Sequence, residues 1–195
     1  MIYLTLHGET EWNRQRRFQG QLDSPLTEHG VQQARLMGTT LRVLLGDSTG
    51  CTIVSSPLGR AHRTAEIICE VLGIAPKQIE TDARLAEINL GSWAGCTRDE
   101  VKARWPGALD DTGRYDWYFR SPDGESLDDV TTRVRQWLSD TAARDRRIAV
   151  SHGVTSRILR GIYGGIAKPV ALTLEVSRDV VFRLHDGSID RIPCE

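Results

Sequence analysis

Short apolar runs alternate with segments of helical periodicity along the chain. Three of these runs have the length and flanks of buried strands that enter loops: Met1–Leu6, Cys51–Val54 and Arg147–Val150. Between the first two, residues 27–45 carry apolar side chains at helical spacing, with Thr27 as N-cap and Gly46 as the stop. A second helix follows the second strand and is predicted to end at Leu72. The chain therefore begins as strand, helix, strand, helix.

The second half continues this alternation and ends in a hairpin. Thr97 and Glu100 have the spacing of a capping box, which predicts a short helix, and Ser126 precedes a longer apolar stripe. Another helix follows the third strand. Near the end, Asp186-Gly187 is a strong turn signal between two strand-like runs, Val180–Leu184 and Ser188–Ile192. The pattern predicts an α/β layered fold, with an antiparallel element added to a parallel sheet.

Length and composition narrow the class of protein. The 195 residues suit a single domain spanning 1–195, because no repeat or Gly/Ser linker divides them. A formal net charge of -1 argues against a nucleic-acid partner, and no apolar run is long enough to cross a membrane. The N-terminal run lacks the features of a signal peptide, and four scattered cysteines favour reduced thiols. We expect a soluble cytoplasmic enzyme or small-ligand binder.

Two of the predicted strands are followed directly by a His-Gly pair. His7-Gly8 follows the first strand, and His152-Gly153 follows the third. Ligands of parallel α/β sheets bind at the carboxyl ends of the strands, where both histidines would lie. A single histidine of this kind is more often a satisfied core or capping residue. Two of them favour a shared site.

Two other segments carry residues suited to anion chemistry. Arg60 lies at the start of the second helix, where the backbone amides and the helix dipole favour anions, or it belongs to a solvated helix face. A guanidinium group there adds a planar fork for phosphate or carboxylate. Glu87 lies in an apolar, glycine-bounded stretch and is either a proton donor or an ordinary loop carboxylate.

Taken together, these segments resemble the histidine phosphatase superfamily, in its phosphoglycerate-mutase-like branch. The matching residues occur in the family's order over most of the chain: His7–Thr10 with Asn13, Arg17–Gly20, Leu22–Thr27, Ser56–Leu58 with Arg60, Thr64-Ala65, Arg84-Leu85 with Glu87, Gly91, Trp93 and Gly95, and Ser151–Gly153. The resemblance implies a three-layer sandwich, in which helices flank a mixed, mostly parallel central sheet.

The resemblance also implies a phosphoryl-transfer enzyme that needs no metal or other cofactor. In it, His7 is the nucleophile that forms a phosphohistidine. Arg60 and His152 hold the phosphoryl oxygens, and Glu87 is the acid and base. The implied substrate-binding residues are Asn13, Gln19, Gly20 and Gly153.

One position departs from the family pattern. The family has arginine immediately before the nucleophilic histidine, and this chain has Leu6. Losing one such contact with the phosphoryl group costs about 10²–10³ in rate by analogy with an oxyanion-hole donor. A nearby arginine could replace the charge: Arg14, Arg16, Arg17 or Arg63. Otherwise the protein is a weak enzyme, a binder of phosphorylated ligands without turnover, or a chain altered at position 6. We expect retained but reduced activity.

The branch contains both phosphatases and mutases. The chain is compact, as in the phosphatases, so we expect hydrolysis of a small phosphorylated metabolite, with phosphoglycerate mutase as the alternative. Residues 97–125 would cover the site, and the aromatic stretch Trp105–Pro122 would either stack on a substrate or, as we expect, pack as a small helical subdomain. The sequence leaves the oligomeric state open, a homodimer included.

Overall fold

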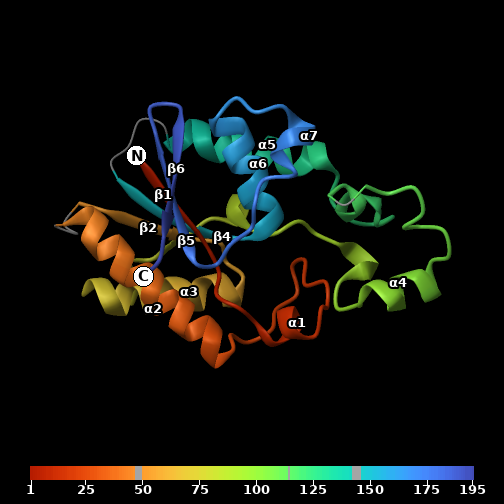
Figure 1. Cartoon of the computed structure of the whole chain (residues 1–195), viewed down its shortest axis with the longest axis horizontal. Coiled ribbons are helices and arrows are strands. Elements are labelled where there is room, and N and C mark those ends of the chain that lie inside the picture. The colour runs from red at the N-terminus through yellow and green to blue at the C-terminus, as the bar shows by residue number, and fades with distance from the viewer. Residues whose placement is uncertain (47–49, 114, 142–145) are drawn as a thin grey trace.

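In the part of the chain that the structure describes, six strands form one mixed sheet at the centre of the molecule. The computed structural model describes residues 1–46, 50–113, 115–141 and 146–195 (Figure 1). The strands are β1 (Ile2–Leu6), β2 (Thr52–Ser55), β3 (Glu80–Thr81), β4 (Arg147–Ser151), β5 (Val180–His185) and β6 (Ser188–Pro193). Their order is β3-β2-β4-β1-β5-β6, with the first four parallel and β5 and β6 antiparallel to their neighbours. The predicted hairpin turn is present, because Asp186 and Gly187 both have positive φ, 47° and 77°.

The helices of the described residues include the predicted ones, which begin or end close to the predicted residues, and two four-residue helices that were not predicted. The helices are α1 (Glu11–Arg14), α2 (Glu28–Leu45), α3 (Gly59–Leu72), α4 (Arg98–Arg104), α5 (Leu127–Thr141), α6 (Gly153–Tyr163) and α7 (Lys168–Ala171), with short 3-10 turns η1 (Pro76–Gln78), η2 (Ala83–Leu85), η3 (Gly91–Trp93) and η4 (Trp117–Arg120). Thr27 caps α2, and the capping box of Thr97 and Glu100 starts α4. No helix in the described ranges has the length and apolarity that a membrane span requires.

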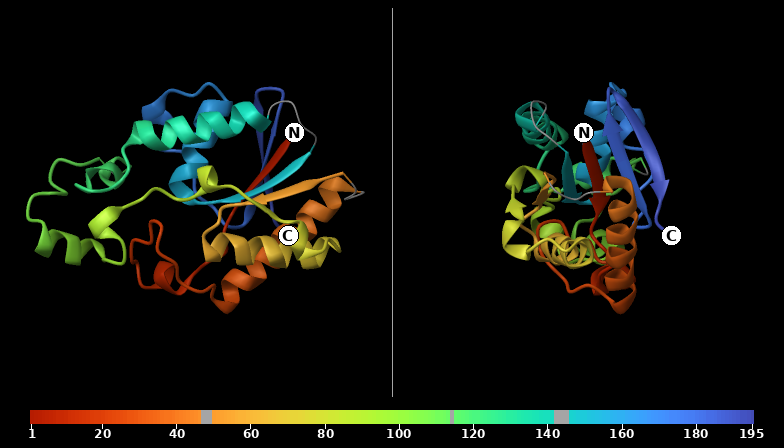
Figure 2. Two further views of the ribbon diagram at one scale, coloured as in Figure 1. Left: turned by 180° about the vertical axis from the view of Figure 1, so that it is seen from behind. Right: turned by 90° about the vertical axis from the view of Figure 1, so that its left-hand side faces the viewer.

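Two hydrophobic clusters, one on each face of the sheet, make a three-layer sandwich. On one face Ile2, Leu4 and Leu6 of β1 pack with side chains of α5 and α6. On the other, Tyr3 packs with Met37 of α2 and with side chains of α3. Figure 2 shows the two pairs of helices on opposite sides of the sheet. The predicted α/β sandwich with a mixed, mostly parallel sheet is thus confirmed.

The segment after η3 extends beyond the sheet and carries a cluster of aromatic side chains. It contains α4 and η4, which lie at the far end of the molecule from β6 (Figure 1). The Trp117 ring lies 4.2 Å from the ring of Phe18 and 4.1 Å from that of Tyr118, and Trp117 is only 9% exposed. The aromatic residues therefore pack against the body of the protein.

A close backbone crossing fixes the loop that leaves β1. A Cβ atom on Gly8 would overlap the carbonyl oxygen of Gly30 in α2, and a Cβ on Gly30 would overlap that of Glu9. Only glycine allows two backbone segments to approach so closely. The crossing anchors the loop directly after His7.

Candidate active site

His7 is held at the end of β1 as a buried imidazole. Its Nδ1 lies 2.7 Å from the carbonyl oxygen of Gly8, and since a carbonyl only accepts, Nδ1 carries the proton. Nε2 is then left with a free lone pair. Burial lowers the pKa of His7 well below 6.5, and the charges of Arg60 and Arg178 lower it further. The ring is therefore neutral at pH 7, the form in which it can act as a nucleophile.

His152 lies beside His7 because β4 lies beside β1. Leu6 is paired with Ser151 across the two parallel strands, so the next residue of each leaves the sheet at the same place. The ring centroids are 5.2 Å apart, and His152 is fully buried. Its Nε2 is 2.7 Å from Oγ of Ser56, whereas Nδ1 has no hydrogen-bond partner in the described part of the chain. Burial, Arg60 and His7 all lower the pKa of His152.

Arg60 lies in the first turn of α3 with a side chain that is 1% exposed. It donates hydrogen bonds to the carbonyl oxygens of Gly20 and Leu22, both at 2.7 Å, and to Asp23 Oδ1 at 2.9 Å. A guanidinium has five N–H donors, so three are committed to the loop and two remain, one of them on the buried Nε, which has no partner among the described residues. Arg60 thus both fixes this loop and keeps donors for a ligand.

Glu87 binds the N-terminus of α6. Its carboxylate accepts hydrogen bonds from the amides of Ile88, Val154 and Thr155 and from the hydroxyl of Thr155, at 3.1–3.2 Å. Two of these amides are among the unpaired donors of the first turn of the helix. The helix end therefore sets the position of the carboxylate.

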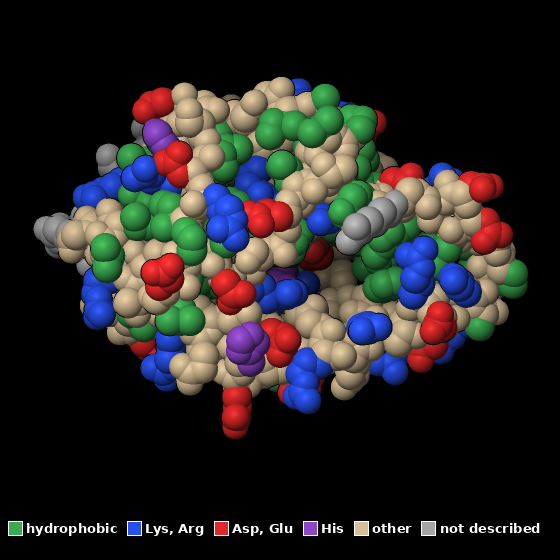
Figure 3. Space-filling view, viewed as in Figure 1, with side chains coloured by type: hydrophobic (Ala, Val, Ile, Leu, Met, Phe, Trp, Pro, Cys, Tyr) green, Lys and Arg blue, Asp and Glu red, His purple; other side chains and the backbone are tan. Residues whose placement is uncertain are grey.

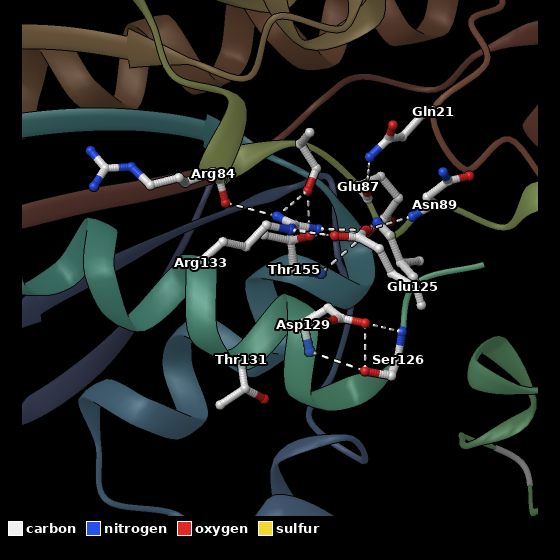
Figure 4. Close-up of polar contacts among 12 residues, drawn as sticks. Gln21, Arg84, Glu87, Asn89, Glu125, Ser126, Asp129, Thr131, Arg133 and Thr155 are labelled. Atoms are coloured by element: carbon white, nitrogen blue, oxygen red, sulfur yellow. Dashed lines mark hydrogen bonds and ion pairs between the residues drawn. The ribbon is translucent and has the colours of Figure 1, made fainter. Parts of the chain in front are cut away.

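A second set of contacts fixes the backbone around Glu87 from α5. The Arg133 guanidinium donates to the carbonyl oxygens of Arg84 and Ala86, both at 2.8 Å. It also pairs with Glu125, which in turn accepts from the amide of Asn89. Figure 4 shows these side chains converging on the segment that carries Glu87. Elements from both halves of the chain hold this carboxylate in place.

These elements enclose a pocket of about 170 Å³. Its lining residues are His7, Asn13, Arg17, Phe18, Gln19, Gly20, Arg60, Glu87, Ile88, Leu90, Trp117, Tyr118, Gly153, Val154 and Arg178. Figure 3 shows the hollow on this face, with histidine and basic side chains on its floor. Of the residues predicted from sequence, seven line the pocket, and the eighth, His152, is buried beside His7. The amide oxygen of Asn13 is used by Thr10, in the cap of α1.

The four arginines predicted to replace the charge missing at position 6 lie in different surroundings. Arg14 and Arg16 are exposed, and Arg63 pairs with carboxylates on its own helix. Arg17 does line the pocket, but it donates to the carbonyl oxygen of Gly95 and pairs with Glu100. The sequence reasoning missed a fifth residue, Arg178, which lines the pocket from the segment before β5.

The fold and the pocket define a class of protein: a three-layer α/β protein with two buried histidines at the carboxyl ends of adjacent parallel strands. The chain belongs to the histidine phosphatase superfamily (branch 1), whose sequence model matches residues 2–178.

Similar proteins include some named as mutases and some named as phosphatases. The chain is 42% identical to a probable phosphoglycerate mutase GpmB of Citrobacter koseri, over 98% of this chain and 83% of the relative. Among solved structures, YhfR of Bacillus stearothermophilus superposes with a TM-score of 0.79 at 31% identity, over 98% of this chain and 95% of that one. A mycobacterial glucosyl-3-phosphoglycerate phosphatase, in a complex with VO3, superposes with a TM-score of 0.77 at 27% identity, over 100% and 98% of the two chains.

Proposed function

We propose that this protein is a phosphomonoesterase that works through a phosphohistidine at His7. The observation that carries the proposal is the geometry of His7, whose Nδ1 is bound to the carbonyl oxygen of Gly8 so that Nε2 keeps its lone pair in a pocket with basic walls. A neutral imidazole nitrogen attacks phosphorus without first losing a proton. Nearby cationic groups stabilise the charge that moves onto the phosphoryl oxygens.

The reaction has two steps. Nε2 of His7 forms a bond to phosphorus as the bond from phosphorus to the ester oxygen breaks, and Glu87 gives its proton to the departing alkoxide. Water then attacks the phosphohistidine and passes a proton to Glu87, which releases phosphate and restores Nε2. Arg60, His152, Asn13 and the backbone around Gln19, Gly20 and Gly153 would bind the phosphoryl oxygens. No step of this scheme uses a metal or other cofactor.

A small phosphorylated metabolite is the substrate class we propose. The pocket volume of about 170 Å³ is below the range of about 300–1,000 Å³ usual for drug-sized ligands. Trp117 and Tyr118 form one wall, which supports a role of residues 97–125 as the cover of the site. All four cysteines are free thiols, which supports a reducing compartment such as the cytosol.

Phosphoglycerate mutase is the second candidate, and the names of the curated relatives favour it. A mutase must return the phosphoryl group to a sugar acid before water reaches it. Hydrolysis and transfer therefore compete for one intermediate, and their relative rates separate the two functions.

The test is phosphate release from p-nitrophenyl phosphate in the presence of a chelator, with radioactive phosphoryl substrate used to trap an acid-labile label. We expect turnover and a label that His7→Ala abolishes. A label on a residue other than His7, or release that persists in His7→Ala, would overturn the mechanism. Transfer between phosphoglycerates that is faster than phosphate release would identify a mutase.

A further inference from the structure

Arg178 is a basic side chain of the pocket for which the structure shows no hydrogen bond and no ion pair to the described residues. It lines the pocket together with His7, Arg60 and Glu87. Its Nε is buried and makes no hydrogen bond within the described ranges, and the structure records no ion pair for its guanidinium there. A buried guanidinium N–H without an acceptor is costly, so such groups are normally hydrogen-bonded. An anion in the pocket would supply the missing partner.

The segment that carries Arg178 is fixed from α6. The Arg157 guanidinium donates to the carbonyl oxygen of Leu174 at 2.6 Å, and Arg160 donates to that of Glu175 at 2.5 Å. Arg160 also lies over the ring of Phe182 in β5, 3.9 Å from its centroid. Both arginines of α6 therefore hold backbone just before Arg178.

The other side of Arg178 is fixed from α2. Gln33 donates to Asp179 Oδ1 at 3.1 Å and accepts from the amide of Glu9 at 2.9 Å. One glutamine thus ties the residue after Arg178 to the loop after His7. Contacts on both sides of Arg178, to the backbone before it and to the Asp179 side chain after it, give the guanidinium a defined position, as a ligand-binding group requires.

Strand pairing places the start of β5 beside position 6, and Arg178 lies in the segment just before that start. β5 runs antiparallel to β1, with Leu4 opposite Phe182 and Ile2 opposite Leu184. Continuing this register brings the start of β5 beside Leu6, and Arg178 is two residues before that start. The side chain at position 6 is an aliphatic member of the core, 1% exposed. The segment that enters the neighbouring strand, β5, therefore brings the positive charge of Arg178 close to the end of β1, where position 6 has none.

We propose that Arg178 binds the phosphoryl oxygens in place of the arginine that this chain lacks at position 6. This inference rests on the proposed function, because it assigns a further contact in the same phosphate pocket. Glu9, Asp179, Glu87 and Arg60 are the charged groups that influence the Arg178 guanidinium. The first three attract it and Arg60 repels it, and a phosphoryl dianion between the two arginines would relieve that repulsion.

The test combines oxyanion binding with turnover in three variants. Orthovanadate affinity is measured by calorimetry, and kcat/KM by hydrolysis of p-nitrophenyl phosphate, for the unmutated chain, Arg178→Met and Arg178→Lys. Arg35→Met, an exposed arginine of α2, is the control for the change in net charge. For Arg178→Met we expect vanadate to bind at least tenfold more weakly and kcat/KM to fall about 10²–10³-fold. Arg178→Lys should keep part of the vanadate affinity and part of kcat/KM, because lysine keeps the charge but not the planar fork of donors.

Binding and turnover together separate this inference from the proposed function. If the unmutated chain binds vanadate but does not hydrolyse the ester, the proposed function fails, and the vanadate affinities of the variants still decide the role of Arg178. An Arg178→Met protein with unchanged affinity and turnover would overturn the inference. So would a loss of thermal stability with no change in vanadate affinity.

Restoring the family's arginine is a second, independent measurement. Leu6→Arg should raise kcat/KM by less than tenfold in the unmutated chain, where Arg178 already supplies the charge. In the Arg178→Met background it should restore activity by more than tenfold. A gain of hundreds-fold in the unmutated chain would show that the charge at position 6 is not replaced. If Leu6→Arg does not fold, the Arg178→Lys arm decides alone.

Discussion

Acidification from pH 7 to pH 5 should weaken the fold through the two histidines of the pocket. Burial and the Arg60 charge lower the pKa of both His7 and His152 well below 6.5. In the unfolded chain both return to ordinary histidine values near 6.5. The unfolded state then binds more protons than the folded state between pH 6.5 and the lowered pKa values. The stability from these two neutral rings is fully present above pH 6.5 and is lost as pH falls toward the folded-state pKa values.

The expected slope of the free energy of unfolding against pH follows from the number of protons that the two histidines take up on unfolding. One proton of difference changes the free energy of unfolding by about 1.4 kcal/mol per pH unit, so two buried histidines approach a slope of about 3 kcal/mol per pH unit. Carboxylates such as Asp82 and Asp190, whose pKa values are lowered from 3.8, contribute only at more acid pH. The range from pH 6.5 to 5 therefore isolates the histidines.

Urea unfolding, followed by tryptophan fluorescence at half-unit steps from pH 7.5 to 5.0 in phosphate-free buffer, measures this slope. His7→Asn and His152→Asn should each remove about half of it, whatever their stability at pH 7.5. His29→Asn, at an exposed position of α2, is the matched control and should leave it unchanged. A free energy of unfolding that stays constant from pH 7 to 5 in the unmutated chain would refute the view that both rings are buried and neutral.

Three further substitutions test the groups around these rings. Glu87→Gln should lower kcat for an alkyl phosphate by about 10²–10⁴-fold. It should lower kcat for p-nitrophenyl phosphate much less, because nitrophenolate leaves without a proton. Equal losses of kcat on both substrates would contradict the role of Glu87 as proton donor. Asp23→Ala removes the carboxylate that accepts hydrogen bonds from both Arg60 and the amide of Gly59. It should lower the free energy of unfolding in urea by about 1–3 kcal/mol. An unchanged value would show that the carbonyl oxygens of Gly20 and Leu22 are enough to hold Arg60. Ser56→Ala leaves the buried Nε2 of His152 without its partner and should cost about 1–3 kcal/mol in the same assay, a result that an unshifted urea midpoint would exclude.

The sequence favoured a shared site for His7 and His152, and the structure brings their rings together because local pattern and sheet geometry act in the same direction. Two short apolar runs each end in a His-Gly pair, and adjacent parallel strands deliver their carboxyl ends to one edge of the sheet. The first residues of α2 and α4 could be predicted in the same way, because the capping side chains of Thr27 and Thr97 each bind the backbone amide three residues later. Local interactions of this kind leave a signature in the sequence.

Side-chain partners across the fold left no such signature. Arg60 was predicted as an anion-binding group, yet three of its donors bind Gly20, Leu22 and Asp23, about forty residues earlier in the chain. Glu87 depends in the same way on Thr155 and Arg133, on two different helices. Which of several polar groups satisfies a buried donor depends on tertiary packing, and the sequence contains many equivalent candidates.

Arg178 shows what an argument from strand direction can miss. The arginines predicted to replace the charge at position 6 all follow predicted parallel strands: Arg14, Arg16 and Arg17 follow the first strand, and Arg63 follows the second. An antiparallel strand delivers its first residue to the edge where parallel strands deliver their last. The C-terminal hairpin was predicted, but its partner strand was not; once β5 is paired with β1, residues just before Val180 must lie near the residues just after Leu6. The same rule applies to any mixed sheet with a site at the carboxyl ends of its strands: segments that enter an antiparallel neighbour belong to the site as much as the loops that leave the parallel strands.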